Sequence, residues 1–285
     1  MIDFDLIKDP TEEELNALDR ELFFSEVTNG QPQTLTPSQI DSYNAQGYLM
    51  PFDGLGAKEV IEFRTFFERV LEKTISEGNN SYSISTAHLK FGEIYDLMYH
   101  PAIIAPVKDL LGGDLVAWGA HFFCKLPNDG KRVPWHQDCP YWPLTPPLTV
   151  TVWLAIDDAD PENANMRFIP RSHLDGVIEY QISESEDDVL KREVTDAQNY
   201  GNPVDVSLKA GQFSMHCDLL LHGSEANESN RRRSGLTMRY AAAQVKPYLG
   251  WEQKGVVVSG KDGNGHWKNF PRPPDFRLCI FSRLP

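Results

Sequence analysis

The sequence of 285 residues contains no apolar run of about 18 residues, the length that a helix needs to span a bilayer. It also lacks a recognisable leader, because residues 1–5 are acidic where a secretory signal peptide carries basic and then apolar residues. We therefore expect a protein that has no membrane partner and works in the cytoplasm.

Positive charge is scarce in this chain. The 27 lysines and arginines are outnumbered by 41 aspartates and glutamates, which gives a formal net charge of −14. Binding to DNA or RNA depends on basic side chains that neutralise phosphates, so we expect no nucleic-acid partner. The one compact basic run, Arg231-Arg232-Arg233, lies beside the candidate site described below, and we interpret it as part of that region.

Cysteine is also rare, and the cysteines show no paired spacing of the kind that binds zinc. The chain has four of them, Cys124, Cys139, Cys217 and Cys279. We expect free thiols, as is usual in a reducing cytoplasm. Cys139 directly follows the acidic residue of the candidate site, which would place its thiol near any oxidant formed there.

The chain has enough apolar and aromatic residues for a sizeable core, with 41% hydrophobic and 11% aromatic residues. Residues 1–34 look like an appended acidic segment. Within it, Thr11-Glu12-Glu13-Glu14 is a capping-box pattern that predicts a short helix as far as Phe24. This segment either packs on the domain or joins copies of the chain in a homo-oligomer. We assign residues 35–285 to a single domain.

A helical front is followed by a strand-rich remainder. Hydrophobic spacing and capping signals predict helices over residues 36–47, 57–76 and 101–111. Alternating and β-branched patterns predict strands over residues 115–125, 148–156, 166–169, 212–221 and 236–245. This order predicts a mainly β fold with flanking helices, whose core is a double-stranded β-helix, the cupin-like jelly roll. Residues 175–205 are polar and acidic, and we interpret them as a solvated insertion or a lid.

The most informative pattern is a pair of histidines with one carboxylate. His136 and Asp138 are two residues apart, which on an extended strand points both side chains to one face, and His222 follows 84 residues after the aspartate. Two imidazoles and one carboxylate bind one face of an iron(II) ion and leave the opposite positions open, as non-haem oxygenases require. His216 is the alternative distal histidine, but it lacks the Gly-Ser and the arginine that follow His222.

An arginine follows the distal histidine by 11 residues. The guanidinium of Arg233 is always charged and offers two parallel donors, which suits the carboxylate of an organic co-substrate. Arg231 and Arg232 compete for this role. Arg239 lies six residues further along the expected strand on the same face as Arg233, so it too could reach the pocket.

With these motifs the chain resembles the phytanoyl-CoA dioxygenase family of iron(II)- and 2-oxoglutarate-dependent oxygenases, from about Leu35 to Pro273. The matching text is Val133-Pro134-Trp135-His136-Gln137-Asp138, Tyr141-Trp142-Pro143, the run from Val150 to Asp158, Glu162-Asn163, the run from Phe168 to His173, His222-Gly223-Ser224, Asn227, Ser229 and Arg233. These site motifs are specific to the family.

The resemblance implies a set of roles for individual residues. His136, Asp138 and His222 would hold iron(II). Arg233 would bind 2-oxoglutarate, with Ser224 beside it and Trp153 lining the same pocket. O2 would be the second co-substrate, and succinate and CO2 would be released. The carboxylate of Asp138 favours hydroxylation, or another C–H oxidation such as desaturation, over halogenation, because related halogenating enzymes have a small residue at that position.

The chain departs from the family pattern at two turns. It has Glu162-Asn163-Ala164 where the family has Glu-Asn-Gly, so a turn that exploits glycine must accept a side chain. It also has Pro170-Arg171-Ser172-His173 where the family favours Pro-Gly-Ser-His. We hypothesise that Arg171 reaches the pocket mouth and recognises an anionic substrate group. The null alternative is a surface arginine, and we expect His173 to be a structural hydrogen-bonding residue.

The substrate is the least determined part of the prediction. Tyr141 and Trp142 are candidates for an aromatic wall, which would suit an alkyl chain or a quaternary ammonium group. His88 and Lys90 lie where a substrate-covering loop is expected. We expect hydroxylation of an unactivated C–H bond in a small polar or zwitterionic metabolite, with a carboxylate or phosphonate as its anionic group. The alternatives are a zinc-type hydrolase or isomerase on the same three residues, and a non-catalytic jelly-roll binding protein.

Overall fold

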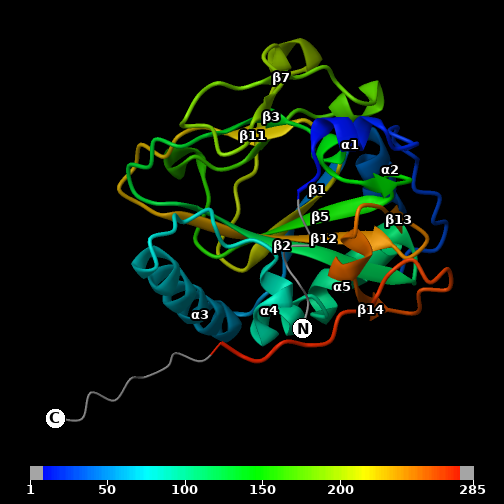
Figure 1. Ribbon diagram of the computed structural model, residues 1–285, viewed down its shortest axis with the longest axis horizontal. Coiled ribbons are helices and arrows are strands. Elements are labelled where there is room, and N and C mark those ends of the chain that lie inside the picture. Colours follow the sequence, from blue (N-terminus) through cyan, green and yellow to red (C-terminus); the bar gives the residue numbers. More distant parts are fainter. Residues whose placement is uncertain (1–8, 277–285) are drawn as a thin grey trace.

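Two antiparallel sheets form the core of the computed structural model, which describes residues 9–276 (Figure 1). The larger sheet has the strand order β1 (Tyr48–Asp53), β10 (Gln212–Cys217), β5 (Thr149–Ala155), β12 (Arg233–Ala242), β2 (Leu115–Lys125) and β14 (Val256–Ser259). The smaller sheet has the order β3 (Val133–His136), β11 (His222–Ser224), β6 (Arg167–Phe168) and β9 (Val204–Asp205). Two short pairs join β13 (Lys246–Pro247) to β4 (Leu144–Thr145) and β7 (Gln181–Ile182) to β8 (Arg192–Glu193). Strands distant in sequence therefore pair in both sheets, and the predicted jelly-roll core is confirmed.

The centre of the larger sheet is buried on both faces. Every residue of β5 is buried, and β12 pairs with β5 on one side and with β2 on the other. The apolar and β-branched sequence of β5 fits this position, since a strand covered on both faces needs no polar face. The ladder between β12 and β2 shifts at Arg239 and Tyr240, a bulge that lies next to the site described below.

Helices pack against the larger sheet. α3 (Ala57–Ser76) and α5 (Pro101–Leu111) have the bounds that their apolar spacing predicts, and α4 (Gly92–Leu97) lies beside them below the sheet in Figure 1. Phe67 of α3 is fully buried and stacks on Phe122 of β2, with ring centroids 5.0 Å apart. This contact ties the helical front to the strand that forms one wall of the site.

The predicted helix over residues 36–47 is also present, as α2 (Pro37–Gln46). The Thr36 hydroxyl accepts from the backbone N–H of Gln39, and Gly47 closes the helix with a left-handed φ of 84°, which glycine adopts without strain. Short 3-10 helices lie between other elements: η2 (Ala87–Leu89), η3 (Cys139–Tyr141), η4 (Pro161–Asn163), η5 (Ser172–Asp175), η6 (Ala197–Tyr200) and η7 (Trp251–Lys254).

The helix predicted to reach Phe24 is shorter than expected. α1 (Glu12–Asn16) forms its capping box but has only one turn, with Leu15 as its buried residue. The chain beyond it lies against the core instead of continuing as a helix. Arg20 donates a hydrogen bond of 2.6 Å to the carbonyl oxygen of Trp142, a tertiary contact that local sequence patterns do not report.

The strand predicted over residues 212–221 is wrong in its second half. β10 ends at Cys217, and His222 begins β11 in the other sheet. The residues between them, which include three consecutive leucines and Asp218, are buried where the chain passes from one sheet to the other. Their backbone groups bond to other segments, since Cys139 N–H donates to the Asp218 carbonyl at 2.8 Å and Ile169 N–H donates to the Leu221 carbonyl at 2.9 Å.

The described part of the N-terminal segment, residues 9–34, lies against this same core. The carboxylate of Asp109 accepts from the backbone N–H groups of Gln33, Thr34 and Leu35, and the Asn44 side chain bonds to the backbone of Val27. Packing on the chain's own domain is therefore observed. The domain boundary at residue 35 and a homo-oligomer stay predictions. Within residues 9–276, no helix combines the length and apolarity that crossing a membrane requires.

The described cysteines are Cys124, Cys139 and Cys217, and all are free and buried. Burial is the largest cause that raises the pKa of each of these thiols. They are therefore protonated at neutral pH and poorly nucleophilic. Cys279, which the sequence analysis also expects to be a free thiol, lies outside the described residues.

Candidate active site

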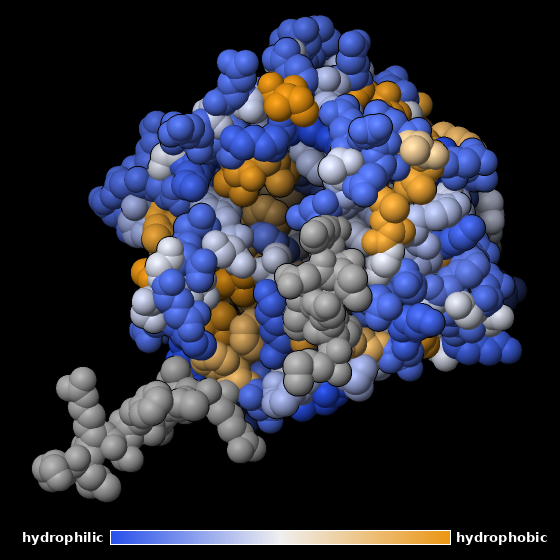
Figure 2. Space-filling model, in the orientation of Figure 1, coloured by the Kyte–Doolittle hydropathy of each residue, from blue (hydrophilic) through white to orange (hydrophobic). Residues whose placement is uncertain are grey.

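A cavity of about 1090 Å³ lies between the two sheets. It is lined by residues of β2, β5 and β12 from the larger sheet and of β3 and β11 from the smaller one. Figure 2 shows a hollow on one face of the molecule. Two further walls come from the polar segment predicted as an insertion or lid, through residues 182 and 188–192, and from residues 9–15 of the N-terminal segment.

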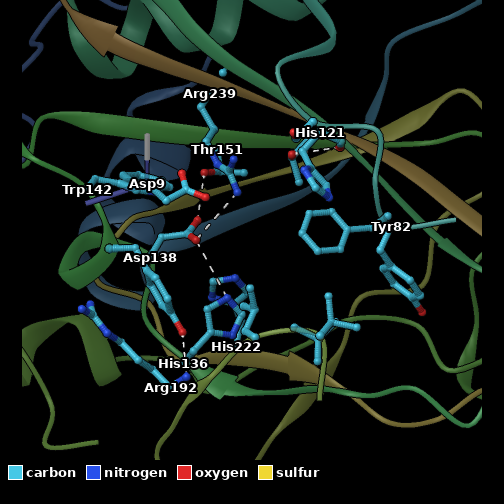
Figure 3. A pocket seen from close by; sticks show the side chains of 18 of the residues that line it. Asp9, Tyr82, His121, His136, Asp138, Trp142, Thr151, Arg192, His222 and Arg239 are labelled. Atoms are coloured by element: carbon cyan, nitrogen blue, oxygen red, sulfur yellow. Dashed lines mark hydrogen bonds and ion pairs between the residues drawn. The ribbon is translucent and has the colours of Figure 1, made fainter. Parts of the chain in front are cut away.

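His136, Asp138 and His222 meet in this cavity. Each offers one nitrogen or oxygen atom, and these atoms lie within 4.8 Å of one another (Figure 3). The pairing of β3 with β11 sets His136 opposite His222, with ring centroids 4.1 Å apart. The strand argument for Asp138 is wrong in detail, because β3 ends at His136 and Asp138 has helical backbone angles at the start of η3. The turn nevertheless brings its carboxylate to the same side.

Backbone carbonyls fix which nitrogen of each histidine faces the cavity. Nδ1 of His136 lies 2.8 Å from the carbonyl oxygen of Pro134, and Nδ1 of His222 lies 2.9 Å from that of Leu220. A carbonyl oxygen can only accept, so each Nδ1 carries the proton and donates it. Each Nε2 therefore keeps a free lone pair, as in histidines that bind metals.

Burial and charge set the protonation of the three residues. Burial lowers the pKa of His136 to about 3, with the neighbouring His222 acting in the same direction, and it also lowers the pKa of His222. Burial alone would raise the pKa of Asp138, but Arg239 and the two histidines outweigh it and leave the pKa lowered. The result is two neutral imidazoles beside one carboxylate, the protonation state that a divalent metal requires.

Arg233 lies at another end of the cavity. Its side chain is buried, donates to the Ser224 hydroxyl at 3.0 Å and to the Ala164 carbonyl at 3.1 Å, and stacks over the indole of Trp153 at 5.6 Å. Within residues 9–276 it forms no ion pair with a carboxylate. Burial lowers its pKa to about 10, which still leaves it charged at neutral pH. A buried guanidinium without a counter-ion indicates a site for an anion.

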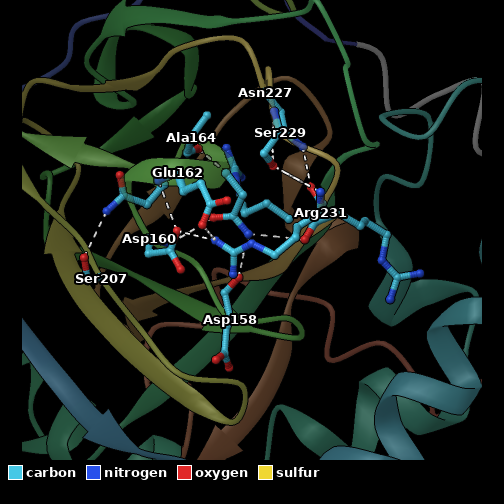
Figure 4. A network of polar contacts seen from close by, with 12 residues as sticks. Asp158, Asp160, Glu162, Ala164, Ser207, Asn227, Ser229 and Arg231 are labelled. Atoms are coloured by element: carbon cyan, nitrogen blue, oxygen red, sulfur yellow. Dashed lines mark hydrogen bonds and ion pairs between the residues drawn. The ribbon is translucent and has the colours of Figure 1, made fainter.

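The two competing arginines are occupied elsewhere. Arg231 forms ion pairs with Asp160 and Glu162, as Figure 4 shows, and Arg232 pairs with Asp157 at 2.8 Å. Neither lines the cavity. Of the three consecutive arginines, Arg233 alone is placed for a buried ligand.

A buried lysine lies next to Arg233, and sequence reasoning missed it. Lys125 is directly opposite Arg233 across β2 and β12, and its side-chain nitrogen donates to the backbone carbonyls of Lys131, Ser224 and Glu225. These bonds tie β2 to the strand that carries Ser224. Burial, the largest cause, lowers the pKa of Lys125 to about 6, so the amine is mostly neutral at pH 7 and adds little positive charge to this end of the cavity.

Both departures from the family pattern fall at left-handed backbone positions. Ala164 has a φ of 58° and Arg171 a φ of 74°, where side chains are strained and glycine is not. The turn at Ala164 therefore accepts a side chain, as the sequence requires, and its carbonyl bonds to Arg233. The left-handed turn at Arg171 carries that side chain away from the cavity. It lies in a separate depression with Leu174 and Tyr200.

The predicted substrate residues are only partly brought together. Tyr141, Trp142 and Lys90 line the cavity, whereas Arg171 and His88 are not among its lining residues. His88 is fully buried, and its Nε2 lies 3.0 Å from the carbonyl oxygen of Lys254. Its side chain is therefore part of the packed interior. The structural role expected for His173 is confirmed, since its Nε2 lies 3.0 Å from the carbonyl oxygen of Asn44.

Two further cavity residues lie beside the three donors, and only His216 was singled out from the sequence. Thr151 donates to the second oxygen of Asp138 at 3.3 Å, and His216 lies 4.7 Å from the His222 ring with neither ring nitrogen hydrogen-bonded. His216 is outside the group of three donors, so it does not replace His222. The alternation along β12 is the signal that did find Arg239, which lines the cavity together with Arg233.

Comparison with known proteins identifies the family. A family model described as phytanoyl-CoA dioxygenase (PhyH) matches residues 43–235. The chain therefore belongs to the phytanoyl-CoA dioxygenase family and is a non-haem iron oxygenase that uses 2-oxoglutarate, as its sequence motifs predict. The matched residues include His136, Asp138, His222, Arg233 and the turn at Ala164.

Individual relatives agree with this assignment. The chain is 24% identical over 246 residues to a probable phytanoyl-CoA dioxygenase of Caenorhabditis elegans, covering 76% of this chain and 79% of the relative. It is 28% identical over 212 residues to a probable alpha-ketoglutarate-dependent hypophosphite dioxygenase of Stutzerimonas stutzeri, covering 69% of each. The apo structure of the non-haem monooxygenase ThoJ superposes with a TM-score of 0.68 at 26% identity, covering 82% of this chain and 87% of that one.

Proposed function

We propose that His136, Asp138 and His222 hold iron(II), that Arg233 with Ser224 and Trp153 binds 2-oxoglutarate, and that the enzyme hydroxylates a C–H bond of a small molecule. The observation that carries this assignment is the Arg233 guanidinium. It is buried without a carboxylate partner among the described residues, and it lines the same cavity as the three donors. A dicarboxylate is the ligand that such a cation and such a donor set would share.

The residues present fit the metal. Two Nε2 lone pairs and one ionised carboxylate make a facial set of donors that suits non-haem iron(II). The carbonyls of Pro134 and Leu220 hold both imidazole rings in the required tautomer before any ion arrives. Thr151 bonds to one oxygen of Asp138, while the other oxygen lies 3.9 Å from Nε2 of His136.

When bound, iron(II) supplies the activation of O2 that couples decarboxylation of 2-oxoglutarate to oxidation of a substrate C–H bond, with release of succinate and CO2. The chain's residues prepare that chemistry. Arg233 supplies a fixed positive charge for the far carboxylate, and Trp153 and the Ser224 hydroxyl hold the guanidinium in place. The buried walls keep water from the reacting groups.

For the substrate, we propose a small polar or zwitterionic metabolite that carries a carboxylate or phosphonate. Lys90 at the cavity and the aromatic side chains of Tyr141 and Trp142 support this choice. The relative from Stutzerimonas stutzeri, which is named for its action on hypophosphite, is consistent with a small anion.

The test is to load the protein with iron(II) under argon, add 2-oxoglutarate and O2, and measure succinate with and without a metabolite panel. Slow succinate release that depends on O2, and that a panel member stimulates with an oxygen atom gained in the product, is the expected result. Product formation with zinc and without O2 would instead identify a hydrolase or isomerase. Absence of iron and 2-oxoglutarate binding would identify a non-catalytic binding protein.

A further inference from the structure

One wall of the cavity is a group of tryptophans that contact the side chains of an arginine and a lysine. The guanidinium of Arg239 on β12 lies over the rings of Trp118 and Trp142, at 5.8 and 5.1 Å. The ammonium of Lys254, in η7, lies 3.4 Å from the ring centroid of Trp251. Since the rings of Trp118 and Trp251 are 5.3 Å apart, both cations belong to one cluster, which we call the tryptophan wall.

Arg239 has donors that the protein leaves unused. Its guanidinium makes no hydrogen bond within residues 9–276, and its buried Nε has no partner. Its one ion-pair contact, to Asp138, is 3.9 Å long and so exceeds hydrogen-bond range. A guanidinium that is 18% exposed and faces a cavity with its donors unused is arranged for an incoming acceptor (Figure 3).

Lys254, in the same cluster as Arg239, also has a side-chain nitrogen without a hydrogen-bond partner among the described residues. The residue is 5% exposed, and its ammonium forms neither a hydrogen bond nor an ion pair among the described residues. The acid that acts on it is Asp9, an exposed residue that also lines the cavity. The buried Nε1 of Trp118 and Nε2 of His121, both from β2, also lack partners and line the same cavity.

The cavity is basic although the chain is acidic. Seven lysines and arginines line it against four aspartates and glutamates, in a chain of net charge −14. Two of those acids are already engaged, because Asp138 belongs to the proposed metal site and Asp188 pairs with Arg132 at 2.6 Å. Among the described residues, the cavity therefore has more basic than acidic side chains, and Arg233 alone does not account for the difference.

We propose that the prime substrate is an organic acid whose anionic group is bound by Arg239 and Lys254 on the tryptophan wall. The inference rests on the proposed function for the metal and co-substrate, and it adds the residues and the charge that select the substrate. The chain's own cations already cover the indole faces. A quaternary ammonium group, which an empty aromatic wall would suit, would here meet the charged guanidinium of Arg239 and the amine of Lys254, whose pKa burial lowers to about 7.

The position of the tryptophan wall also explains how the substrate would be aligned. Arg239 lies between Asp138 and the indoles of Trp118 and Trp142. An acid held there would have its body within reach of the three donors, while Arg233 lies six residues away on the same strand. Two arginines six residues apart on one strand would thus bind two different anions in the same cavity.

The test is an anaerobic titration of the iron(II)- and 2-oxoglutarate-loaded protein, followed by intrinsic tryptophan fluorescence. The probes are benzoate and phenylphosphonate, with benzamide as the neutral analogue and benzyltrimethylammonium as the cation. We expect the acids to bind at least about tenfold more tightly than benzamide, because a charge-assisted bond replaces a neutral one. We expect the ammonium probe to bind more weakly than benzamide.

Two variants assign that preference to residues. In Arg239→Gln and Lys254→Gln the preference for acid over amide should fall about tenfold, while benzamide affinity stays constant. Arg171→Gln, outside the cavity, is the matched control and should keep the preference. Circular dichroism and the 2-oxoglutarate affinity of each variant test whether its fold is intact. Because Arg239 and Lys254 are substituted separately, one misfolded variant would still leave the other as a test.

Equal affinities for acids and amide, or an unchanged preference in both variants, would overturn the proposal. If Arg239→Gln weakens iron binding but keeps the acid preference, Arg239 only positions Asp138 and the proposal is equally wrong. Succinate release without any prime substrate is measured in parallel. If the parent protein releases no succinate, the proposed function is contradicted. The fluorescence titration needs no turnover, so a failure of the substrate proposal can be told apart from a failure of the proposed function.

Discussion

Gly235 lies directly against the indole of Trp153. A Cβ atom at residue 235 would come within 2.1 Å of the Cζ2 atom of that ring, a separation that real atoms do not adopt. The two residues lie on the neighbouring strands β12 and β5, and the same indole supports the guanidinium of Arg233. The absence of a side chain at 235 is therefore a condition for the proposed 2-oxoglutarate pocket.

Gly235→Ala should impair the co-substrate pocket without changing any charge. The methyl group must displace the Trp153 ring, so we expect a KM for 2-oxoglutarate raised about tenfold and a loss of about 1–3 kcal/mol of stability from overpacking. Steady-state kinetics and urea unfolding measure the two effects. Gly113→Ala, where a Cβ would meet no atom within 4 Å, is the control and should behave as the parent.

Asp138→Ala should abolish both metal binding and turnover. It removes the one carboxylate from the donor set, so we expect iron(II) affinity to fall by more than about 100-fold, beyond what outer contacts contribute. Anaerobic titration with iron(II) and succinate release measure this. Asp41→Ala on α2, an exposed position, is the matched control. Full substrate oxidation by Asp138→Ala would refute the assignment of the metal site.

Substitution of Arg233 should separate charge from geometry. Arg233→Lys keeps the charge but loses the two parallel donors, and Arg233→Met loses both. We expect the KM for 2-oxoglutarate to rise about tenfold in the first variant and about 100-fold or more in the second. Arg232→Lys, in the ion pair with Asp157, should leave this KM unchanged. Equal KM values in all variants would remove Arg233 from the site.

Arg171→Gly should stabilise the protein and leave catalysis unchanged. A non-glycine residue in the left-handed region costs about 1–2 kcal/mol, part of which is offset by the extra freedom of glycine in the unfolded chain. We expect a net gain of up to about 1 kcal/mol in urea unfolding. Arg171→Ala keeps the strained backbone and should not show this gain. Lower substrate affinity in both variants would restore the hypothesis that Arg171 binds the substrate.

Asp218 should make stability depend on pH. Burial, as the largest cause, raises its pKa to about 8, from an ordinary value of 3.8. Between these values the folded state holds a proton that the unfolded state has lost, so this residue's contribution to stability falls as pH rises from about 4 to 8. The Thr149 hydroxyl, 2.7 Å from the Asp218 carboxylate, moderates the effect.

The measurement is urea unfolding of the parent and of Asp218→Asn at pH 5, 6.5 and 8. Asparagine keeps an acceptor for Thr149 but never carries charge. We therefore expect the variant to gain stability relative to the parent as pH rises, by at most about 1.4 kcal/mol per pH unit, the limit for one proton. A difference that stays constant with pH would show that Asp218 is ionised in the folded protein at all three values.

Much of the fold was predictable because its signals are local. The apolar spacing of α3 and the β-branched run of β5 gave the correct bounds to within a residue. His136, Asp138, His222 and Arg233 were identifiable from residue type and spacing, since few other chemistries need that set, and the structure brings all four into one cavity.

The rest depends on tertiary contacts. The run before His222 has the same composition as a strand, and only its bonds to Cys139 and Ile169 show that it crosses between sheets. Arg171 resembled a pocket residue because sequence does not report the sign of φ. Lys254 and Trp251 lie far beyond the site motifs, so only the fold places them next to Arg239.

The walls of the cavity come partly from the stretch that the family model matches and partly from residues outside it. The proposed ligands for metal and 2-oxoglutarate lie within residues 43–235, the stretch that the family model matches, whereas Arg239, Lys254 and residues 9–15 lie outside it. Trp118 and Trp142 of the tryptophan wall lie inside the matched stretch, so the proposed substrate site is divided between the two parts of the chain. Grafting the two flanking stretches onto another member of the family would therefore move Arg239 and Lys254 without altering the proposed metal ligands.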